Sequence, residues 1–207
     1  GDLAGLFQNG TVGEGSDTAS LKLPGIQEEL LNSVLATGKP VVVVLVSGRP
    51  YAIEEAVQKA GAILATWLPG EGGGEAVART LLGLNNPGGK SPLSFPKTAG
   101  AMPYTYNFAK KAGGLPRQKQ FGANFPFGHG LSYTSFAWDD FSLESPMVGI
   151  DGEFVFSLTV KNTGDVAGDE VVQVYIHDKM ASIVRPVKEL KAFARLHLEA
   201  GEKKKVT

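Results

Sequence analysis

Residues 38–51 read GKPVVVVLVSGRPY and contain the longest apolar run of the chain. Six consecutive apolar residues, Val41 to Val46, are bounded by Lys39-Pro40 on one side and by a Ser-Gly-Arg-Pro turn on the other. A continuous, mostly β-branched run of this length is typical of a strand that is covered on both faces, as the strands of parallel sheets are. The stretch therefore predicts a buried parallel strand of an α/β domain.

The segments on either side of this strand alternate between helix and strand. Pro24 opens a helix at its favoured first position, apolar residues recur at helical spacing to give one buried face, and Gly38 closes the helix. After the strand, residues 53–60 and 75–82 are predicted as helices, with a short strand over 62–67 between them. This order implies parallel strands joined by right-handed crossovers.

The pattern changes in the second half of the chain. Residues 85–132 are rich in Gly, Pro, Asn and aromatic residues and show no sustained period, so we expect a long ordered connection to another domain. From Phe136 onward the period is two, and strands are predicted over 154–161, 170–177 and 190–198. Such spacing favours an antiparallel β-sandwich, which we expect to be incomplete because the sequence stops within an apparent strand.

The composition excludes several classes of function. The 207 residues include 20 Lys and Arg against 21 Asp and Glu, which is unlike the basic balance of a nucleic-acid-binding domain. The absence of cysteine excludes a disulfide scaffold, a zinc ribbon, an iron–sulfur site and a cysteine nucleophile. No apolar run approaches the roughly 20 residues that cross a bilayer. The three histidines show no ligand spacing, so we expect no metal site.

Two glycine clusters suggest phosphate binding, but neither fits a known pattern. In residues 85–91, NNPGGKS, the first glycine of a P-loop would fall at Leu84, and Pro92 prevents the usual helix start. In residues 70–75, GEGGGE, Glu75 stands where the dinucleotide fingerprint requires Gly or Ala. We therefore expect turns and helix capping here, and no nucleotide cofactor.

One loop carries candidate catalytic chemistry. Residues 13–17, GEGSD, form a flexible loop with two carboxylates just before the first predicted helix, where α/β folds place their ligand crevices. Glu14 lies between two glycines and has little steric cover, which suits a general acid or base. Loop solvation and helix capping explain the same residues without catalysis, so the loop alone leaves both interpretations open.

Together these motifs resemble the C-terminal half of glycoside hydrolase family 3 enzymes of the β-glucosidase and β-xylosidase type. The resemblance covers nearly the whole chain, and five stretches carry it in the family's order. They are GEGSD (13–17) with LKLPGIQ (21–27), VSGRPY (46–51), WLPGEGG (67–73) with NPGGK (86–90), FPFGHGLSY (125–133), and NTG (162–164) with GDEVVQVY (168–175) and RPVKEL (185–190).

The resemblance implies a three-part architecture: an N-terminal (β/α) barrel, an α/β sandwich and a fibronectin type III-like β-sandwich. It assigns residues 1–132 to the later part of a three-layer α/β sandwich with a parallel sheet, and residues 133–207 to a partial β-sandwich. It further implies a retaining, exo-acting β-glycosidase, foremost a β-glucosidase, that removes β-linked sugars from non-reducing ends. The Asp nucleophile lies on the barrel, which this chain lacks, and Glu14 stands at the position of the general acid/base.

On this interpretation the chain alone is inactive. Its partners are the barrel, on the same or a separate chain, and an oligosaccharide or aryl β-glycoside; no cofactor, nucleic acid or membrane is implied. A homo-oligomer is compatible with it, and an extracellular or periplasmic location is favoured over a cytoplasmic one. Arg49 is expected to pair with a carboxylate or carbonyl and hold its loop. The alternative is a non-catalytic glycan-binding or protein-interaction module.

Overall fold

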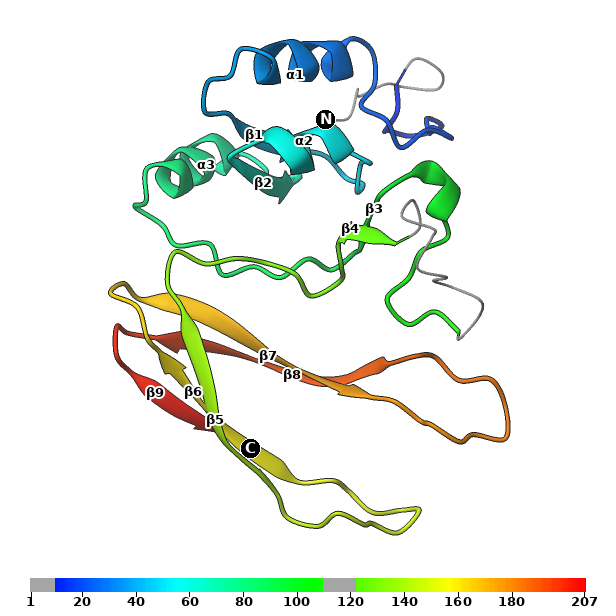
Figure 1. The fold of residues 1–207 in the computed structure, drawn as a ribbon, viewed down its shortest axis with the longest axis vertical. Helices are drawn as coiled ribbons and strands as arrows, with labels where there is room; N and C mark the ends of the chain where they lie inside the picture. Colours follow the sequence, from blue (N-terminus) through cyan, green and yellow to red (C-terminus); the bar gives the residue numbers. More distant parts are fainter. Residues whose placement is uncertain (1–9, 110–121) are drawn as a thin grey trace. The chain divides into compact units, whose positions relative to one another are not determined.

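The computed structural model describes residues 10–109 and 122–207, which form two compact units (Figure 1). Each unit is assembled from three separate stretches of the chain. The described residues of the first unit lie within 10–78, 91–129 and Asp178–Lys188, and the second unit comprises Arg79–Lys90, Gly130–His177 and Glu189–Thr207.

The first unit is built on a parallel pair of strands. β1 (Val42–Val46) pairs with β2 (Ala62–Trp67), and α2 (Glu54–Lys59) connects them. α1 (Gln27–Leu35) precedes β1, and α3 (Gly73–Leu81) follows β2. The parallel pairing and the alternation of helix and strand confirm the α/β class that the apolar run predicted. The expectation that this strand is covered on both faces was wrong for this chain, because Leu45 is buried but Val42 and Val46 are exposed.

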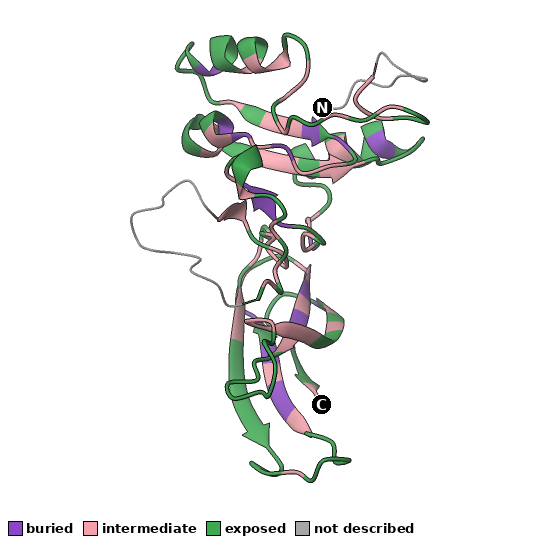
Figure 2. Cartoon of the chain, turned by 90° about the vertical axis from the view of Figure 1, so that its right-hand side faces the viewer, coloured by how far each residue is buried: buried purple, intermediate pink, exposed green. Residues whose placement is uncertain are grey.

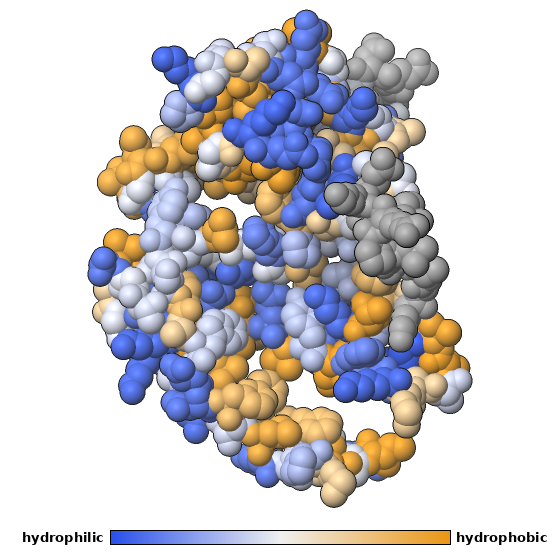
Figure 3. All heavy atoms as spheres, in the orientation of Figure 1, coloured by the Kyte–Doolittle hydropathy of each residue, from blue (hydrophilic) through white to orange (hydrophobic). Residues whose placement is uncertain are grey.

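The predicted start of α1 at Pro24 was wrong. The helix begins at Gln27, because Gly25 takes a left-handed conformation with φ +60° that interrupts the helical path. The predicted buried face is also only partly buried in this chain. Leu35 is buried, whereas Ile26 and Leu30 are exposed, and Figure 3 shows hydrophobic side chains at the surface of this unit.

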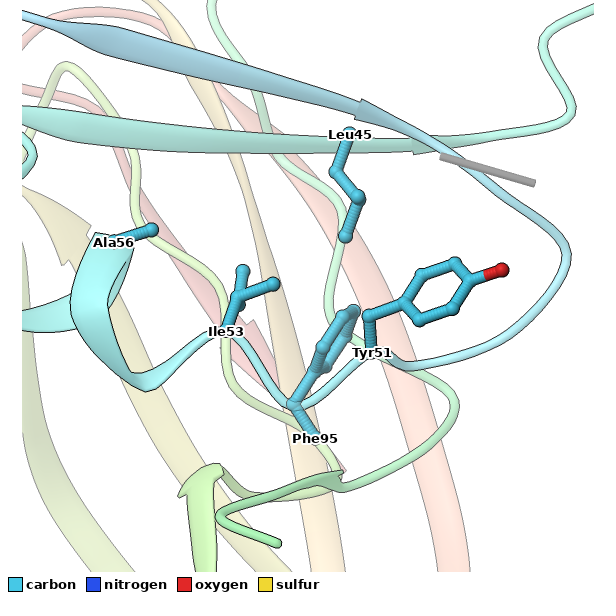
Figure 4. Close-up of a cluster of buried hydrophobic side chains, with 5 residues drawn as sticks. All are labelled: Leu45, Tyr51, Ile53, Ala56 and Phe95. Carbon is cyan, nitrogen blue, oxygen red and sulfur yellow. The ribbon is translucent and has the colours of Figure 1, made fainter. Parts of the chain in front are cut away.

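The core of the first unit lies between β1 and the segment that follows it. Leu45 points from β1 toward Tyr51 and Phe95, and Ile53 and Ala56 complete the cluster (Figure 4). Tyr51 is fully buried, and Leu45 and Ile53 are at most 4% exposed. Burial of an aliphatic or aromatic side chain of this size contributes about 1.5–3 kcal/mol. The chain directly after the SGRP turn is therefore firmly anchored.

The stretch predicted as a long ordered connection without a sustained period contains short regular elements in the first unit. β3 (Phe95–Pro96) pairs antiparallel with β4 (Ala123–Phe125), and a 3₁₀ turn, η1, spans Ala99–Ala101. Strands of two or three residues show no readable period, and their partners lie far apart in sequence. For these reasons the sequence did not indicate the pair.

The second unit contains two antiparallel sheets (Figure 1). β6 (Phe156–Asn162) lies between β5 (Phe136–Leu143) and β9 (Lys203–Val206) in one sheet. β7 (Gly168–Ile176) pairs with β8 (Glu189–Leu198) in the other. The antiparallel pairing confirms the predicted second β-domain.

The core of the second unit is formed by apolar residues that alternate with other residues along the strands. Val160 and Leu198 are fully buried, Val172 is 2% exposed, and Leu158 packs with them. Buried residues lie along β6 and β7, whereas most of β5 is exposed (Figure 2). Phe154, which shares the predicted apolar period, is exposed and lies before the start of β6 at Phe156.

The segment 79–90 belongs to the second unit and is held there by Asn86. The side-chain amide of Asn86 donates to the carbonyl of Ala167 at 2.8 Å, and its oxygen accepts from the Ser132 hydroxyl and the Tyr133 N–H at 2.9 and 2.8 Å. The Tyr133 hydroxyl donates to the Thr80 carbonyl at 2.8 Å. These hydrogen bonds join the segment to residues that are distant in sequence.

We therefore expect Asn86→Ala to destabilise the second unit. It leaves the partners on both sides of the amide unsatisfied, at a cost of about 2 kcal/mol. Asn85→Ala is the matched control, since Asn85 is exposed and donates to Thr80 Oγ1 at 3.1 Å. Urea unfolding of both variants measures the difference, and equal midpoints would contradict the role assigned to Asn86.

Candidate functional site

Glu14 lies at the tip of a tight turn in the first unit. Gly13 and Gly15 both have positive φ, +122° and +69°, which residues with a side chain rarely adopt. The N–H of Ser16 donates to the Gly13 carbonyl at 3.0 Å and closes the turn. The glycines on either side are thus required by the backbone, and the Glu14 side chain is exposed.

Arg49 contacts the chain on both sides of this turn. Its Nη1 donates to Asp17 Oδ1 at 2.9 Å, and its Nη2 donates to the carbonyl oxygen of Thr11. The Arg49 side chain is 20% exposed and that of Asp17 is 86% exposed. The expectation that Arg49 pairs with a carboxylate or a carbonyl is confirmed, and it pairs with both.

The backbone of Arg49 is held by its neighbours in the SGRPY stretch. The hydroxyl of Ser47 donates to the Arg49 carbonyl at 2.9 Å, and the Ser47 N–H donates to the Trp67 carbonyl at 3.1 Å. Ser47 is 2% exposed and Tyr51 is fully buried. The guanidinium therefore projects from a fixed point at the end of β1.

The carboxylate of Asp17 stays ionised over a wide pH range. The N–H of Thr18 donates to it at 2.7 Å, and this hydrogen bond together with Arg49 lowers the pKa of Asp17 below its ordinary value. A lowered pKa means that the ion pair is complete above the ordinary Asp value and is lost only as the pH falls through the lower folded value. The contact to Arg49 is thus present at neutral and mildly acidic pH.

A second charged cluster lies across β7 and β8 in the second unit. Asp169 Oδ1 is 2.7 Å from His197 Nδ1, Asp169 Oδ2 accepts from Arg195 Nε at 3.0 Å, and Glu199 lies 3.5 Å from His197 Nε2. This cluster could not be predicted from the sequence, because Asp169 and His197 become neighbours only through the strand register. Within the described ranges, no group of three His, Cys, Asp or Glu side chains is arranged to hold a metal ion.

The cluster predicts an optimum in stability at mildly acidic pH. Hydrogen bonds from Arg195 lower the pKa of Asp169, and the hydrogen bond to Asp169 raises that of His197. The contribution of Asp169 is lost as the pH falls through its lowered value, and that of His197 as the pH rises through its raised value. Both are complete between about pH 3.9 and 6.5, the ordinary values.

Thermal unfolding across pH measures this contribution. In the unmodified chain the midpoint should decline above about pH 6.5, the ordinary His value. The variant His197→Gln should lose that part of the decline, since it removes the group that titrates there. An identical pH profile in the variant would exclude the cluster as its source.

The chain combines a parallel α/β domain with an antiparallel β-sandwich domain. A glutamate flanked by two glycines lies before the first helix. Residues 2–133 match the glycosyl hydrolase family 3 C-terminal domain, and residues 170–207 match a fibronectin type III-like domain. The chain belongs to glycosyl hydrolase family 3. The resemblance drawn from the five sequence stretches is thereby confirmed.

Curated relatives of known name align over nearly the whole chain. A β-xylosidase of Formosa agariphila is 44% identical over 95% of this chain and 28% of its own length. A periplasmic β-glucosidase of Salmonella typhimurium is 40% identical over 96% of this chain and 27% of its own. The chain thus spans between a quarter and a third of the length of these relatives.

A solved structure shares the fold. A mutant β-glucosidase of Listeria innocua, crystallised in complex with laminaribiose, superposes with a TM-score of 0.86 at 38% identity. The match covers 95% of this chain and 29% of that protein.

Within the described residues, no helix of this chain is both long and apolar enough to cross a membrane.

Proposed function

We propose that the chain is part of a retaining, exo-acting β-glycosidase of the β-glucosidase type, to which it supplies the general acid/base Glu14. The observation that carries the proposal is the position of Glu14, exposed at the tip of a glycine-flanked turn in a chain of this family. The names of the relatives, β-xylosidase and β-glucosidase, support the substrate class. The Asp nucleophile lies on a (β/α) barrel outside this sequence.

The chemistry needs a carboxyl group that approaches from a second part of the enzyme. A retaining glycosidase uses two carboxyl groups about 5 to 5.5 Å apart, of which one attacks the anomeric carbon and the other protonates the leaving oxygen. A glutamate at the tip of an exposed turn can reach over the mouth of a barrel. After the glycosyl-enzyme has formed, the same side chain takes a proton from the attacking water.

Reconstitution tests the proposal. The chain is joined to, or mixed with, an N-terminal barrel portion of the family, and hydrolysis of an aryl β-glucoside is followed. We expect hydrolysis by the assembled enzyme and none by this chain alone. Stable association without hydrolysis would instead support the interaction-module alternative.

A further inference from the structure

We propose that Arg49 is a positioning residue that ties together the two stems of the turn presenting Glu14. The inference rests on the proposed function, since it concerns how Glu14 is held in place to act as acid/base. A single arrangement carries it: one guanidinium reaches the Thr11 carbonyl on one stem and the Asp17 carboxylate on the other. Glu14 lies midway between these two contacts in the sequence.

The turn by itself fixes the tip only loosely. Both neighbours of Glu14 are glycines, the residue with the widest backbone freedom, and the side chain is exposed. General acid catalysis requires the carboxyl group to stand within about 2.6–3.2 Å of the atom that it protonates. A displacement of about 1 Å can lower the rate roughly 100-fold. The stems of the turn must therefore be held from outside.

Arg49 is suited to hold them. Its backbone is fixed by the buried Ser47 hydroxyl, and the fully buried Tyr51 follows two residues later. The planar guanidinium offers several donors in a rigid fork, so that it can bind a carbonyl and a carboxylate together. A lysine at the same position carries a single ammonium group and does not reproduce this geometry.

The test compares two substrates in the reconstituted enzyme. An alkyl β-glucoside has a poor leaving group and depends on the acid, whereas a dinitrophenyl β-glucoside leaves without protonation. Arg49→Lys should lower kcat/KM for the alkyl glucoside about 10- to 100-fold, as expected for a misplaced acid, and that for the aryl glucoside less than about 3-fold. Asp17→Ala should shift the ratio of the two values in the same direction.

Lys59→Met is the matched control, because it removes an exposed ion pair with Glu55 at 2.6 Å in α2 of the same unit. Its ratio should equal that of the unmodified enzyme. Equal losses on both substrates, or no loss, in the Arg49 and Asp17 variants would overturn the inference. Since Asp17 is 86% exposed, we expect Asp17→Ala to fold. The Asp17 variant therefore tests the inference even if Arg49→Lys does not fold.

The variant Glu14→Gln separates this inference from the function on which it rests. If Glu14→Gln retains activity on the alkyl glucoside, the acid/base assignment itself is wrong. If Glu14→Gln is selective for poor leaving groups while Arg49→Lys and Asp17→Ala are not, the assignment of Glu14 stands and only the role of Arg49 is refuted.

Discussion

Replacement of Glu14 by Gln in the reconstituted enzyme is expected to lower kcat/KM for a β-glucoside with a poor leaving group by about 10²- to 10⁴-fold, the usual contribution of a general acid. Glutamine keeps the size and polarity of the side chain but has no carboxyl proton to give to the leaving oxygen. A preactivated aryl glucoside needs no such proton, so it should still form the glycosyl-enzyme. Pre-steady-state measurement should then show a burst of phenolate followed by slow turnover.

The chain offers a matched control for this experiment. Glu71 also stands between two glycines, Gly70 and Gly72, and it too is exposed in the first unit. Glu71→Gln changes the same chemical group beside two glycines, of which only Gly70 has a positive φ, and should leave both activities unchanged. Undiminished hydrolysis of an alkyl glucoside by Glu14→Gln would contradict the acid/base assignment. A loss in the Glu71 variant equal to that in the Glu14 variant would do the same.

The fold could be predicted from the sequence wherever local pattern and burial agree. The period of two that includes Leu158 and Val160 marks the inner face of β6. The apolar run over 41–46 predicted the strand β1 but not its burial, since only Leu45 is buried in this chain and Val42 and Val46 are exposed. The start of α1 was misplaced because the favourable Pro24 is followed by Gly25 in a left-handed conformation. Residue type alone does not reveal which glycine takes a positive φ.

Candidate residues of the site could be predicted from the sequence, but their hydrogen-bond partners could not. Glu14 was proposed from its glycine neighbours and from the family resemblance, and its role stays a prediction. Arg49 was expected to pair with a carboxylate or a carbonyl, yet nothing in the sequence joined it to Thr11 and Asp17 across more than 30 residues. The hydrogen bonds of Asn86 could not be predicted either, since they depend on how residues 79–90 pack within the second unit. The predicted division of the chain at residue 132 stays a prediction.

The second large effect is expected at Lys90. Its Nζ lies 3.0 Å from Glu170 Oε1 and donates to the Gly130 carbonyl at 2.9 Å, with the two side chains only 17% and 12% exposed. Lys90→Met keeps the apolar stem and removes the charge, so that the Glu170 carboxylate is left largely buried without its partner. Breaking a buried pair in this way costs about 3–5 kcal/mol. That is a large share of the roughly 5–15 kcal/mol that stabilises a folded protein.

A double variant distinguishes loss of charge pairing from loss of packing. Lys90→Met combined with Glu170→Gln leaves no buried charge, and the glutamine oxygen can still accept the Val171 N–H that Glu170 binds at 2.7 Å. The double variant should therefore recover most of the stability that Lys90→Met loses in urea unfolding, because interacting residues give strongly non-additive effects. Lys59→Met, at an exposed pair, should cost at most about 1 kcal/mol. If the double variant unfolds as readily as Lys90→Met, the loss arises from the packing of the lysine stem, and the ion pair contributes nothing of its own.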